Sequence, residues 1–315
     1  MIVLWILLGI VLLLILISLV TFFAVCGRKE IPWEDHESMV KAVGESYANL
    51  IQGGVDWLRA QNPRELTLTS YDGLRLHARW IPAEKARGTI VFFHGWHSSI
   101  VGDFSPSMPQ YHDMGFNLLL TDQRAQNGSE GRFITFGIRE SRDVAPWVEL
   151  HNRTFGACPV FLAGLSMGAT TVLMATGEKL PDNVRGIIAD CGFTSPWEIM
   201  ADVARTRAHL PAFPLLYLVN FWCRTLGGFD ARENSTVRAM EKNRLPVFLA
   251  HGEADNFVPC RMSREAYDAA RCPKTLLTVP GAGHGRSYLV QKERYINMLS
   301  EFLRSNLERE EAHRL

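Results

Sequence analysis

The residues best suited to chemistry in this sequence are three polar side chains, each of which follows a short apolar run. Ser166 lies in the Gly-Leu-Ser-Met-Gly segment at 164–168, and Asp255 and His284 follow later runs. A serine, an acid and a histidine in this chain order can perform nucleophilic catalysis on carbonyl carbons. The pattern predicts acyl transfer to water, with Ser166 as nucleophile, His284 as general base and Asp255 as the group that orients His284.

The segment around Ser166 has the form G-x-S-x-G between a predicted strand and a predicted helix. The glycines leave room for a tight turn that exposes the hydroxyl, and the helix N-terminus favours developing negative charge. We expect the backbone N–H of Met167 to be one oxyanion donor, and that of Trp96, after His94-Gly95, to be the second. A chance small-residue turn is the alternative, which the flanking strand and helix disfavour.

Two further points concern the choice of the triad acid and the cofactors that the sequence could bind. Glu253 lies two residues before Asp255, and we prefer Asp255 because it directly precedes the Asn-Phe-Val-Pro segment at 256–259. The six cysteines show no paired spacing, and Gly281-Ala282-Gly283 lacks the strand–GxGxxG–helix context of a dinucleotide site. We therefore expect neither a metal nor a cofactor.

The elements that must position these residues alternate between strands and helices. Two segments with period-two alternation predict a β-hairpin across Asp72-Gly73. Six apolar runs at wide spacing follow, and they predict buried parallel strands in an α/β sheet with helices on both faces. Ligands bind such sheets beyond the carboxyl ends of the strands. The hairpin segments are 65–69 and 74–80, and the runs are 89–93, 116–121, 160–163, 186–189, 247–250 and 275–279.

The composition excludes several classes of protein. The chain has 315 residues, and its 33 Lys+Arg and 33 Asp+Glu give a net charge of zero. This balance disfavours a uniformly basic nucleic-acid binder, and we expect no nucleic-acid partner. The apolar fraction of 47% is enough for a packed core, which excludes disorder as the main state. Six cysteines are too sparse for a disulfide scaffold.

The first element is a charge-free segment from Ile2 to Val25. As a helix its 24 residues rise about 36 Å, enough to cross a hydrocarbon core of about 30 Å. A cleaved signal peptide is the alternative, but no Lys or Arg precedes the run and the run is too long. We therefore expect a single-pass membrane anchor. Arg28 and Lys29 follow it, so the positive-inside rule predicts a cytoplasmic catalytic domain.

Three units follow from these patterns. We expect the anchor at 1–27, an amphipathic linker helix within 28–62, and the α/β domain at 63–310. The linker prediction rests on apolar residues spaced by three and four between Glu34 and Arg59. An insertion at about 193–245 contains a proline-broken apolar run that is too short to span a bilayer.

With these residues in view, the sequence resembles the α/β-hydrolase superfamily over residues 65–300. It is most similar to the serine aminopeptidase or acyl-peptide-hydrolase-like branch, and it resembles bacterial membrane-anchored α/β hydrolases. The insertion resembles the helical cap of that family. The motifs that carry the resemblance are His94-Gly95, Asp122-Gln123-Arg124-Ala125, Thr135-Phe136-Gly137, 164–168, 189–195, His251-Gly252 with Asp255 and Val258-Pro259, and Gly283-His284.

The resemblance implies an α/β-hydrolase fold and a serine hydrolase that cleaves esters, thioesters or small amides. A peptidase or an acyltransferase uses the same triad, so each is an alternative enzyme. A catalytically silent binding protein on this fold is the alternative that is not an enzyme. We expect a small acyl substrate, and the cap suggests a lipophilic one; plain cap packing is the alternative. One departure is visible: family members often carry Arg-Ala-His-Gly after the third strand, where this chain has Gln126 and Asn127. That loop shapes the substrate pocket in the family, so we expect this departure to affect the range of substrates.

Overall fold

Eight strands form one sheet in the order β1-β2-β4-β3-β5-β6-β7-β8. Strand β2 runs antiparallel to β1 and β4, and the remaining neighbours are parallel. The expected mostly parallel α/β sheet and its opening hairpin are confirmed. The strands are β1 Arg64–Thr69, β2 Arg75–Ile81, β3 Gly88–Phe93, β4 Phe116–Asp122, β5 Val160–Leu165, β6 Val184–Asp190, β7 Val247–Gly252 and β8 Lys274–Val279.

The structure is a computed structural model that describes residues 1–31, 37, 40–41 and 44–314.

The burial of each strand depends on its position in the sheet. Strands β3 and β7 are buried at every position, as expected of central strands covered on both faces, whereas β1 alternates at the sheet edge. The apolar runs are therefore continuous in the centre of the sheet and alternating at its margin.

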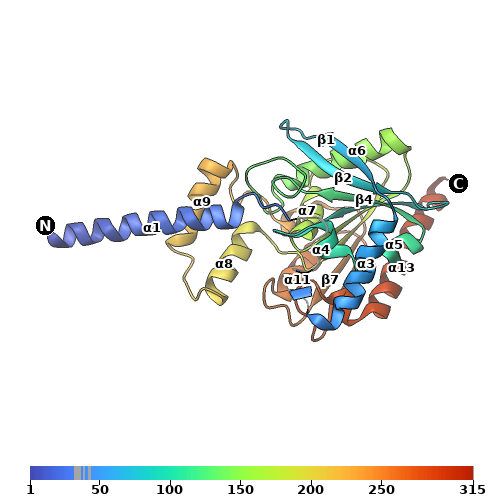
Figure 1. The fold of residues 1–315 in the computed structure, drawn as a ribbon. Helices are drawn as coiled ribbons and strands as arrows, with labels where there is room; N and C mark the ends of the chain where they lie inside the picture. Colours follow the sequence, from blue (N-terminus) through green and yellow to red (C-terminus); the bar gives the residue numbers. More distant parts are fainter. Residues whose placement is uncertain (32–36, 38–39, 42–43, 315) are drawn as a thin grey trace.

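Helices cover both faces of the sheet (Figure 1). Two buried apolar clusters, one on each face, join the helices to the strands. The first face carries α3 Ala48–Ala60, α4 Ile100–Phe104, α5 Met108–Asp113, α12 Ser287–Val290 and α13 Lys292–Arg314. The second carries α6 Val144–Phe155, α7 Met167–Ala175, α10 Thr236–Lys242 and α11 Cys260–Ala269.

Only part of the predicted linker helix lies in the described chain. Helix α3 is amphipathic and buries Ile51, Val55 and Leu58, and the last two belong to the apolar cluster of the first face. Residues 32–36, 38–39 and 42–43 of the predicted helix are outside the described residues. Amphipathic helices commonly pack on their own domain in this way, because contact with other apolar side chains removes the apolar stripe from water.

A third apolar cluster lies beyond the carboxyl ends of the strands. It joins the N-terminal helix α1 Ile2–Cys26 to α8 Pro196–Thr206, α9 Leu215–Trp222 and the π-helical turn η3 Cys223–Gly227. Figure 1 shows α8 and α9 beside the C-terminal part of α1, whose N-terminal part projects away from the domain. By length and composition α1 could cross a membrane, a test that a signal sequence also passes.

The cap is smaller than the predicted insertion. Helix α10 lies within the 193–245 range, but it packs against α7 and α11 and buries Ala239 and Met240 in the second-face cluster. It therefore belongs to the helical layer of the sheet. The name cap is used below for α8, α9, η3 and the residues between them, 196–227.

Candidate active site

Ser166 lies at the tight turn between β5 and α7. Its φ is 55° and its ψ is −115°, a backbone conformation that L-residues rarely adopt. The two flanking glycines are required by contact: a Cβ on Gly164 would lie 2.2 Å from the oxygen of Gly168, and one on Gly168 would lie 1.9 Å from the oxygen of Phe93. The turn can therefore form only where both positions lack a side chain.

The three predicted triad residues come together in the structure. His284 Nε2 lies 2.9 Å from Ser166 Oγ, and His284 Nδ1 lies 2.7 Å from Asp255 Oδ2. Ser166 is 6% exposed and Asp255 is 8% exposed, so the nucleophile and the acid are largely shielded from water, while the His284 side chain is 24% exposed. With Nδ1 protonated toward the carboxylate, Nε2 is free to accept the proton of the Ser166 hydroxyl.

Both oxygens of the Asp255 carboxylate take part in hydrogen bonds. Its Oδ1 accepts hydrogen bonds from the backbone N–H groups of Phe257 at 2.8 Å and Val258 at 2.9 Å. Burial raises the pKa of Asp255, but hydrogen bonds from His251 and His284 outweigh burial and hold that pKa well below its usual range. Asp255 is therefore anionic wherever the protein is folded near neutral pH.

The rival acid Glu253 forms an ion pair outside the triad. Its Oε1 is 3.3 Å from Arg264 in an exposed ion pair. His251, by contrast, is fully buried, and in the sequence it stands out only as part of the His251-Gly252 motif. Its Nε2 lies 3.2 Å from Asp255 Oδ2 and 2.9 Å from the oxygen of Val258, and its Nδ1 lies 2.7 Å from Ser263 Oγ. No local sequence signal separates such a supporting histidine from an ordinary strand-end histidine.

The predicted oxyanion donors come from two elements near Ser166. Met167 is the first residue of α7, and Trp96 lies in the loop after β3 and lines the same cavity as Ser166. A Cβ on Gly95 would lie 3.4 Å from the Ser166 Cβ, which measures how closely this loop approaches the nucleophile. Buried Asp103 holds the loop, because its carboxylate accepts hydrogen bonds from the Gly95 N–H and from Ser98 Oγ.

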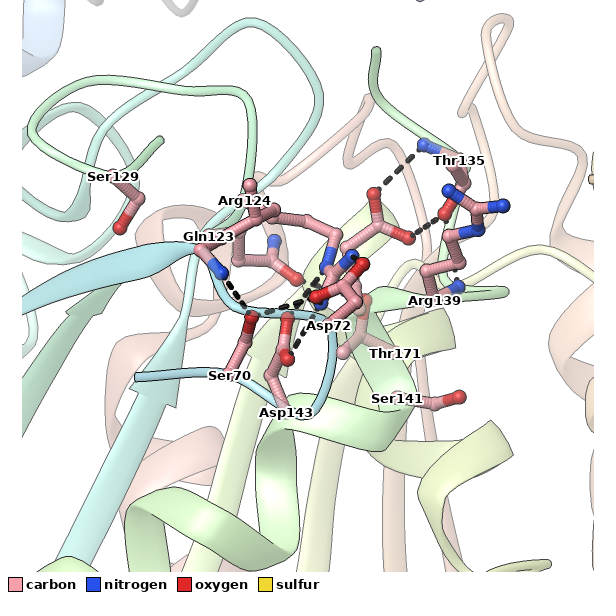
Figure 2. Close-up of polar contacts among 12 residues, drawn as sticks. Ser70, Asp72, Gln123, Arg124, Ser129, Thr135, Arg139, Ser141, Asp143 and Thr171 are labelled. Atoms are coloured by element: carbon pink, nitrogen blue, oxygen red, sulfur yellow. Dashed lines mark hydrogen bonds and ion pairs between the residues drawn. The ribbon is translucent and has the colours of Figure 1, made fainter. Parts of the chain in front are cut away.

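A polar network that is buried except at Asp72 fixes the strand ends around the turn. Figure 2 shows the Arg124 guanidinium between two carboxylates, with Nε 2.6 Å from Asp143 Oδ2 and Nη1 2.8 Å from Asp72 Oδ2. Neighbouring Gln123 donates from Nε2 to the His94 oxygen and accepts at Oε1 from Thr171 Oγ1 at 2.9 Å. Thr171 lies on α7, so this network joins the hairpin, β3 and β4 to the helix that follows Ser166.

The loop that departs from the family pattern binds the segment after α1. Arg28 donates to the backbone oxygens of Asn127 and Ser129, and Asn127 Oδ1 accepts from the Ile31 N–H at 3.0 Å. The Gln126 side chain is fully buried, and its amide has no hydrogen-bond partner in the described part of the chain. No residue of this loop is among the described residues that line the cavity next to Ser166.

A cavity of about 350 Å³ opens above Ser166. Its size lies within the range of small-molecule sites. Ser166 and Thr21 are its two polar lining residues among the described residues, and none of the lining residues is charged. The wall combines Trp96 and Phe257 from the domain, α8 and α9 from the cap, and one face of α1. The arrangement presents a nucleophile at the end of an apolar chamber.

One group near the site has the composition of a metal site. Ligand atoms of Cys191, Asp255 and His284 lie within 4.8 Å of one another. Burial, together with Asp190 and Asp255 nearby, raises the pKa of the Cys191 thiol well above its usual value, which disfavours a thiolate ligand. Asp255 and His284 are already hydrogen-bonded to each other. These contacts fit a proton relay better than a metal site.

Comparison with known proteins decides the family. Residues 84–220 match the family model described as serine aminopeptidase, S33. The uncharacterized protein YqkD of Bacillus subtilis is 31% identical over 216 residues, which are 68% of this chain and 70% of that protein. The chain belongs to the α/β-hydrolase superfamily, in its serine aminopeptidase branch. This hydrolase is also 24% identical to the uncharacterized protein YfhR of Escherichia coli (strain K12), over 69% of this chain and 71% of that one.

Solved structures share the fold of this hydrolase. The Pyrococcus furiosus esterase Pf2001 superposes with a TM-score of 0.64 at 21% identity, covering 83% of this chain and 95% of the esterase. The Pyrococcus horikoshii acylaminoacyl peptidase superposes with a TM-score of 0.58 at 18% identity, covering 80% of this chain and 44% of the peptidase. At these identities the likeness concerns the fold.

Proposed function

We propose that this hydrolase is a membrane-anchored serine esterase that cleaves carboxylic ester or thioester bonds of lipophilic acyl substrates. The observation that carries the proposal is the hydrogen-bonded relay of Ser166, His284 and Asp255 at the end of an apolar cavity. Small amides remain within reach of the same chemistry, because the attacking and proton-transferring groups are the same.

The proposed reaction has two halves. Ser166 Oγ attacks the carbonyl carbon as His284 Nε2 takes its proton, and the alcohol or thiol leaves with that proton. Water then attacks the acyl-enzyme, gives a proton to His284, and releases the carboxylic acid as the proton returns to Ser166. Throughout, Asp255 holds the imidazole tautomer and stabilises the imidazolium.

Negative charge develops on the carbonyl oxygen in both halves. The backbone N–H groups of Trp96 and Met167 are the proposed donors to it, each contributing on the order of 3 kcal/mol to transition-state stabilisation. Asp103, by holding Gly95, keeps the Trp96 loop against the nucleophile turn. These donors would act in a chamber from which apolar walls exclude water.

The cavity wall favours an acyl substrate over a peptide with a free amino terminus. An aminopeptidase needs an acidic group to receive the substrate ammonium, since a buried charge must be paired. Among the described residues lining the cavity, none is charged. The fold likeness to an acylaminoacyl peptidase keeps blocked peptides as the second candidate, because their acylated amino end carries no charge.

Membrane anchoring through α1 is part of the proposal. Phe22 and Cys26 at its C-terminal end are fully buried in the third apolar cluster. Removal of α1 as a signal peptide would strip these side chains from the core, which supports an uncleaved anchor. The positive charges of Arg28 and Lys29 after α1 support a cytoplasmic domain.

The test is hydrolysis of a p-nitrophenyl ester series from acetyl to dodecanoyl by residues 1–315 in detergent or nanodiscs. We expect rates that rise from acetyl to octanoyl, together with labelling by a fluorophosphonate that Ser166→Ala abolishes. Flat rates along the series would refute the lipophilic acyl site. An absence of both turnover and labelling would refute the esterase and favour a silent binding protein. Labelling without ester turnover would favour blocked peptides as substrates.

A further inference from the structure

Helix α1 forms a wall of the cavity above Ser166. Ile17, Thr21 and Val25 line it together with Ser166, Trp96 and the cap. Their spacing of four residues puts all three on one face of the helix. The segment that resembles a tether by composition is therefore also part of the chamber in which the acyl chain would lie.

Specific contacts attach this part of α1 to the domain. Trp222 of the cap donates from Nε1 to Ser18 Oγ at 2.9 Å, and Trp96 donates from Nε1 to the backbone oxygen of Val25 at 2.8 Å. Gly27, just after the helix, pairs with Phe133 in an isolated β-bridge. Contacts on both sides hold the helix in place, so its cavity face keeps one position relative to Ser166.

The length of α1 determines how deep the cap must lie in a bilayer. At about 1.5 Å per residue, the 15 residues Ile2–Leu16 extend about 22 Å, which is about 8 Å less than a hydrocarbon core of about 30 Å. A span formed by the described helix Ile2–Cys26 therefore also needs Ile17 to Thr21 in hydrocarbon. Because Trp222 of the cap donates a hydrogen bond to Ser18, the cap must lie at the same depth in the bilayer as Ser18.

The surface of the cap matches this position. After the end of α1, seven large apolar side chains are exposed in the described part of the chain, and five of them lie between residues 210 and 226 of the cap. Their exposed fractions are 45% for Leu210, 71% for Phe213, 49% for Tyr217, 51% for Phe221 and 45% for Leu226. A cluster of aromatic and aliphatic side chains beside a spanning helix is typical of a surface that enters the interface of a bilayer.

We propose that the cavity opens into one leaflet of the bilayer, and that α1 is a specificity-determining wall of the acyl site as well as an anchor. The substrate is then an acyl ester resident in the membrane, whose chain enters laterally between α1 and the cap. This inference rests on the proposed serine esterase activity. It adds the route of entry, the membrane lipid as the substrate class and the residues of α1 that limit chain length.

The direct test is photo-crosslinking of residues 1–315 in phosphatidylcholine nanodiscs that carry a trace of phosphatidylcholine with a diazirine in its acyl chain. We expect adducts on the cap between 210 and 226 and on the cavity face at Ile17, Thr21 or Val25. Adducts confined to Ile2–Leu16 would overturn the inference. The readout does not require turnover, so it distinguishes a failure of this inference from a failure of the esterase proposal.

A matched pair of variants on neighbouring residues of α1 tests the wall in the reaction. Thr21→Trp fills the cavity from the α1 side, whereas Val20→Trp adds the same side chain at a residue that is 59% exposed and does not line the cavity. We expect Thr21→Trp to lower kcat/KM for an octanoyl ester roughly tenfold or more while acetyl ester turnover stays within about twofold. Val20→Trp should leave both rates near those of the unmodified chain.

Three outcomes separate the two proposals. Equal octanoyl rates in the two variants, with Ser166-dependent turnover intact, would remove α1 from the acyl site and leave the esterase proposal standing. Loss of acetyl and octanoyl turnover alike in Thr21→Trp, with fluorophosphonate labelling also lost, would show a folding role for Thr21 instead of a wall. Absence of all Ser166-dependent chemistry in the unmodified chain would refute the esterase, whatever the crosslinks show.

Discussion

His251 Nε2 lies 3.2 Å from Oδ2 of Asp255, the same carboxylate oxygen to which His284 Nδ1 is hydrogen-bonded. Two histidines thus share one acid, one of them fully buried beneath it and the other facing Ser166. The buried histidine is held in turn by the hydroxyl of Ser263 and the backbone oxygen of Val258. This arrangement makes His251 a positioning residue for the carboxylate.

Replacing His251 should slow the chemistry without weakening substrate binding. His251→Phe keeps most of the ring volume but removes the N–H that faces Asp255 and Val258. We expect kcat to fall roughly tenfold with KM within about twofold, because the acid that orients His284 loses one fixed contact. His251→Gln, whose amide can replace that donor, should recover part of the loss. Rates should be referred to active sites titrated with a fluorophosphonate; an unchanged kcat per titrated site would leave His251 a purely structural role.

Two inactive variants of Ser166 should differ in stability. Ser166→Ala and Ser166→Gly both remove the nucleophile, and we expect each to lower kcat at least about a thousandfold. Since Ser166 has a φ of 55°, Ser166→Gly should also relieve backbone strain and raise the free energy of unfolding by about 1 kcal/mol over Ser166→Ala. Thermal unfolding of the two variants side by side measures the difference. Equal melting temperatures would show that the turn stores no strain.

Neighbouring glycines in α3 test how that helix docks. A Cβ on Gly54 would lie 1.8 Å from the backbone oxygen of Ser105, whereas a Cβ on Gly53 would meet nothing within 4 Å. We expect Gly54→Ala to destabilise the protein by about 2–3 kcal/mol, because backbone must move apart. Gly53→Ala should stabilise it by about 0.5–1 kcal/mol through helix propensity. Urea unfolding in detergent gives both values, and similar effects at the two positions would contradict the docking of α3.

The ion pair between Asp72 and Arg124 should make stability depend on pH in the acid range. Burial raises the pKa of Asp72, but hydrogen bonds from Arg124 and Ser70 outweigh burial and lower that pKa to about 2. The folded state therefore binds fewer protons than the unfolded state, whose Asp pKa is about 3.9. The contribution of Asp72 is fully present above that value and is lost as pH falls toward 2.

The measurement compares Asp72→Asn with the unmodified chain by urea unfolding at pH 7, 4 and 3. We expect the variant to be less stable at pH 7 and the gap to narrow as pH falls. Asp56→Asn is the control, since Asp56 pairs with Arg59 at 3.6 Å on an exposed surface, where such pairs contribute little. A gap for Asp72→Asn that stays constant down to pH 3 would contradict the lowered pKa.

Much of the sheet and of the candidate site could be predicted from local patterns. Continuous apolar runs predicted the central strands, and the period-two segments around Asp72 predicted the edge hairpin. The G-x-S-x-G turn predicted where Ser166 lies, because only glycine tolerates the contacts on either side of it. The chain order of Ser166, Asp255 and His284, each after its own strand, was sufficient to expect their side chains at one edge of the sheet, where the carboxyl ends of parallel strands meet.

Other features depended on contacts between residues far apart in the chain. Two acids two residues apart share a local pattern, and only the fold put Asp255 against His284 and Glu253 against Arg264. His251 resembles any strand-end histidine until the loop at 255–258 folds over it. The 193–245 insertion gave no local boundary between the cap and α10, since both are apolar segments and only packing on α7 and α11 separates them.

The N-terminal segment shows this division most clearly. Its composition alone determined a helix long and apolar enough to span a membrane, because length and hydropathy are local properties. That helix is apolar on every side, so no periodicity marks Ile17, Thr21 and Val25 as different from their neighbours. Only the tertiary structure, through a contact between Ser18 and Trp222 that joins residues 204 positions apart, decided which face of α1 turns toward Ser166.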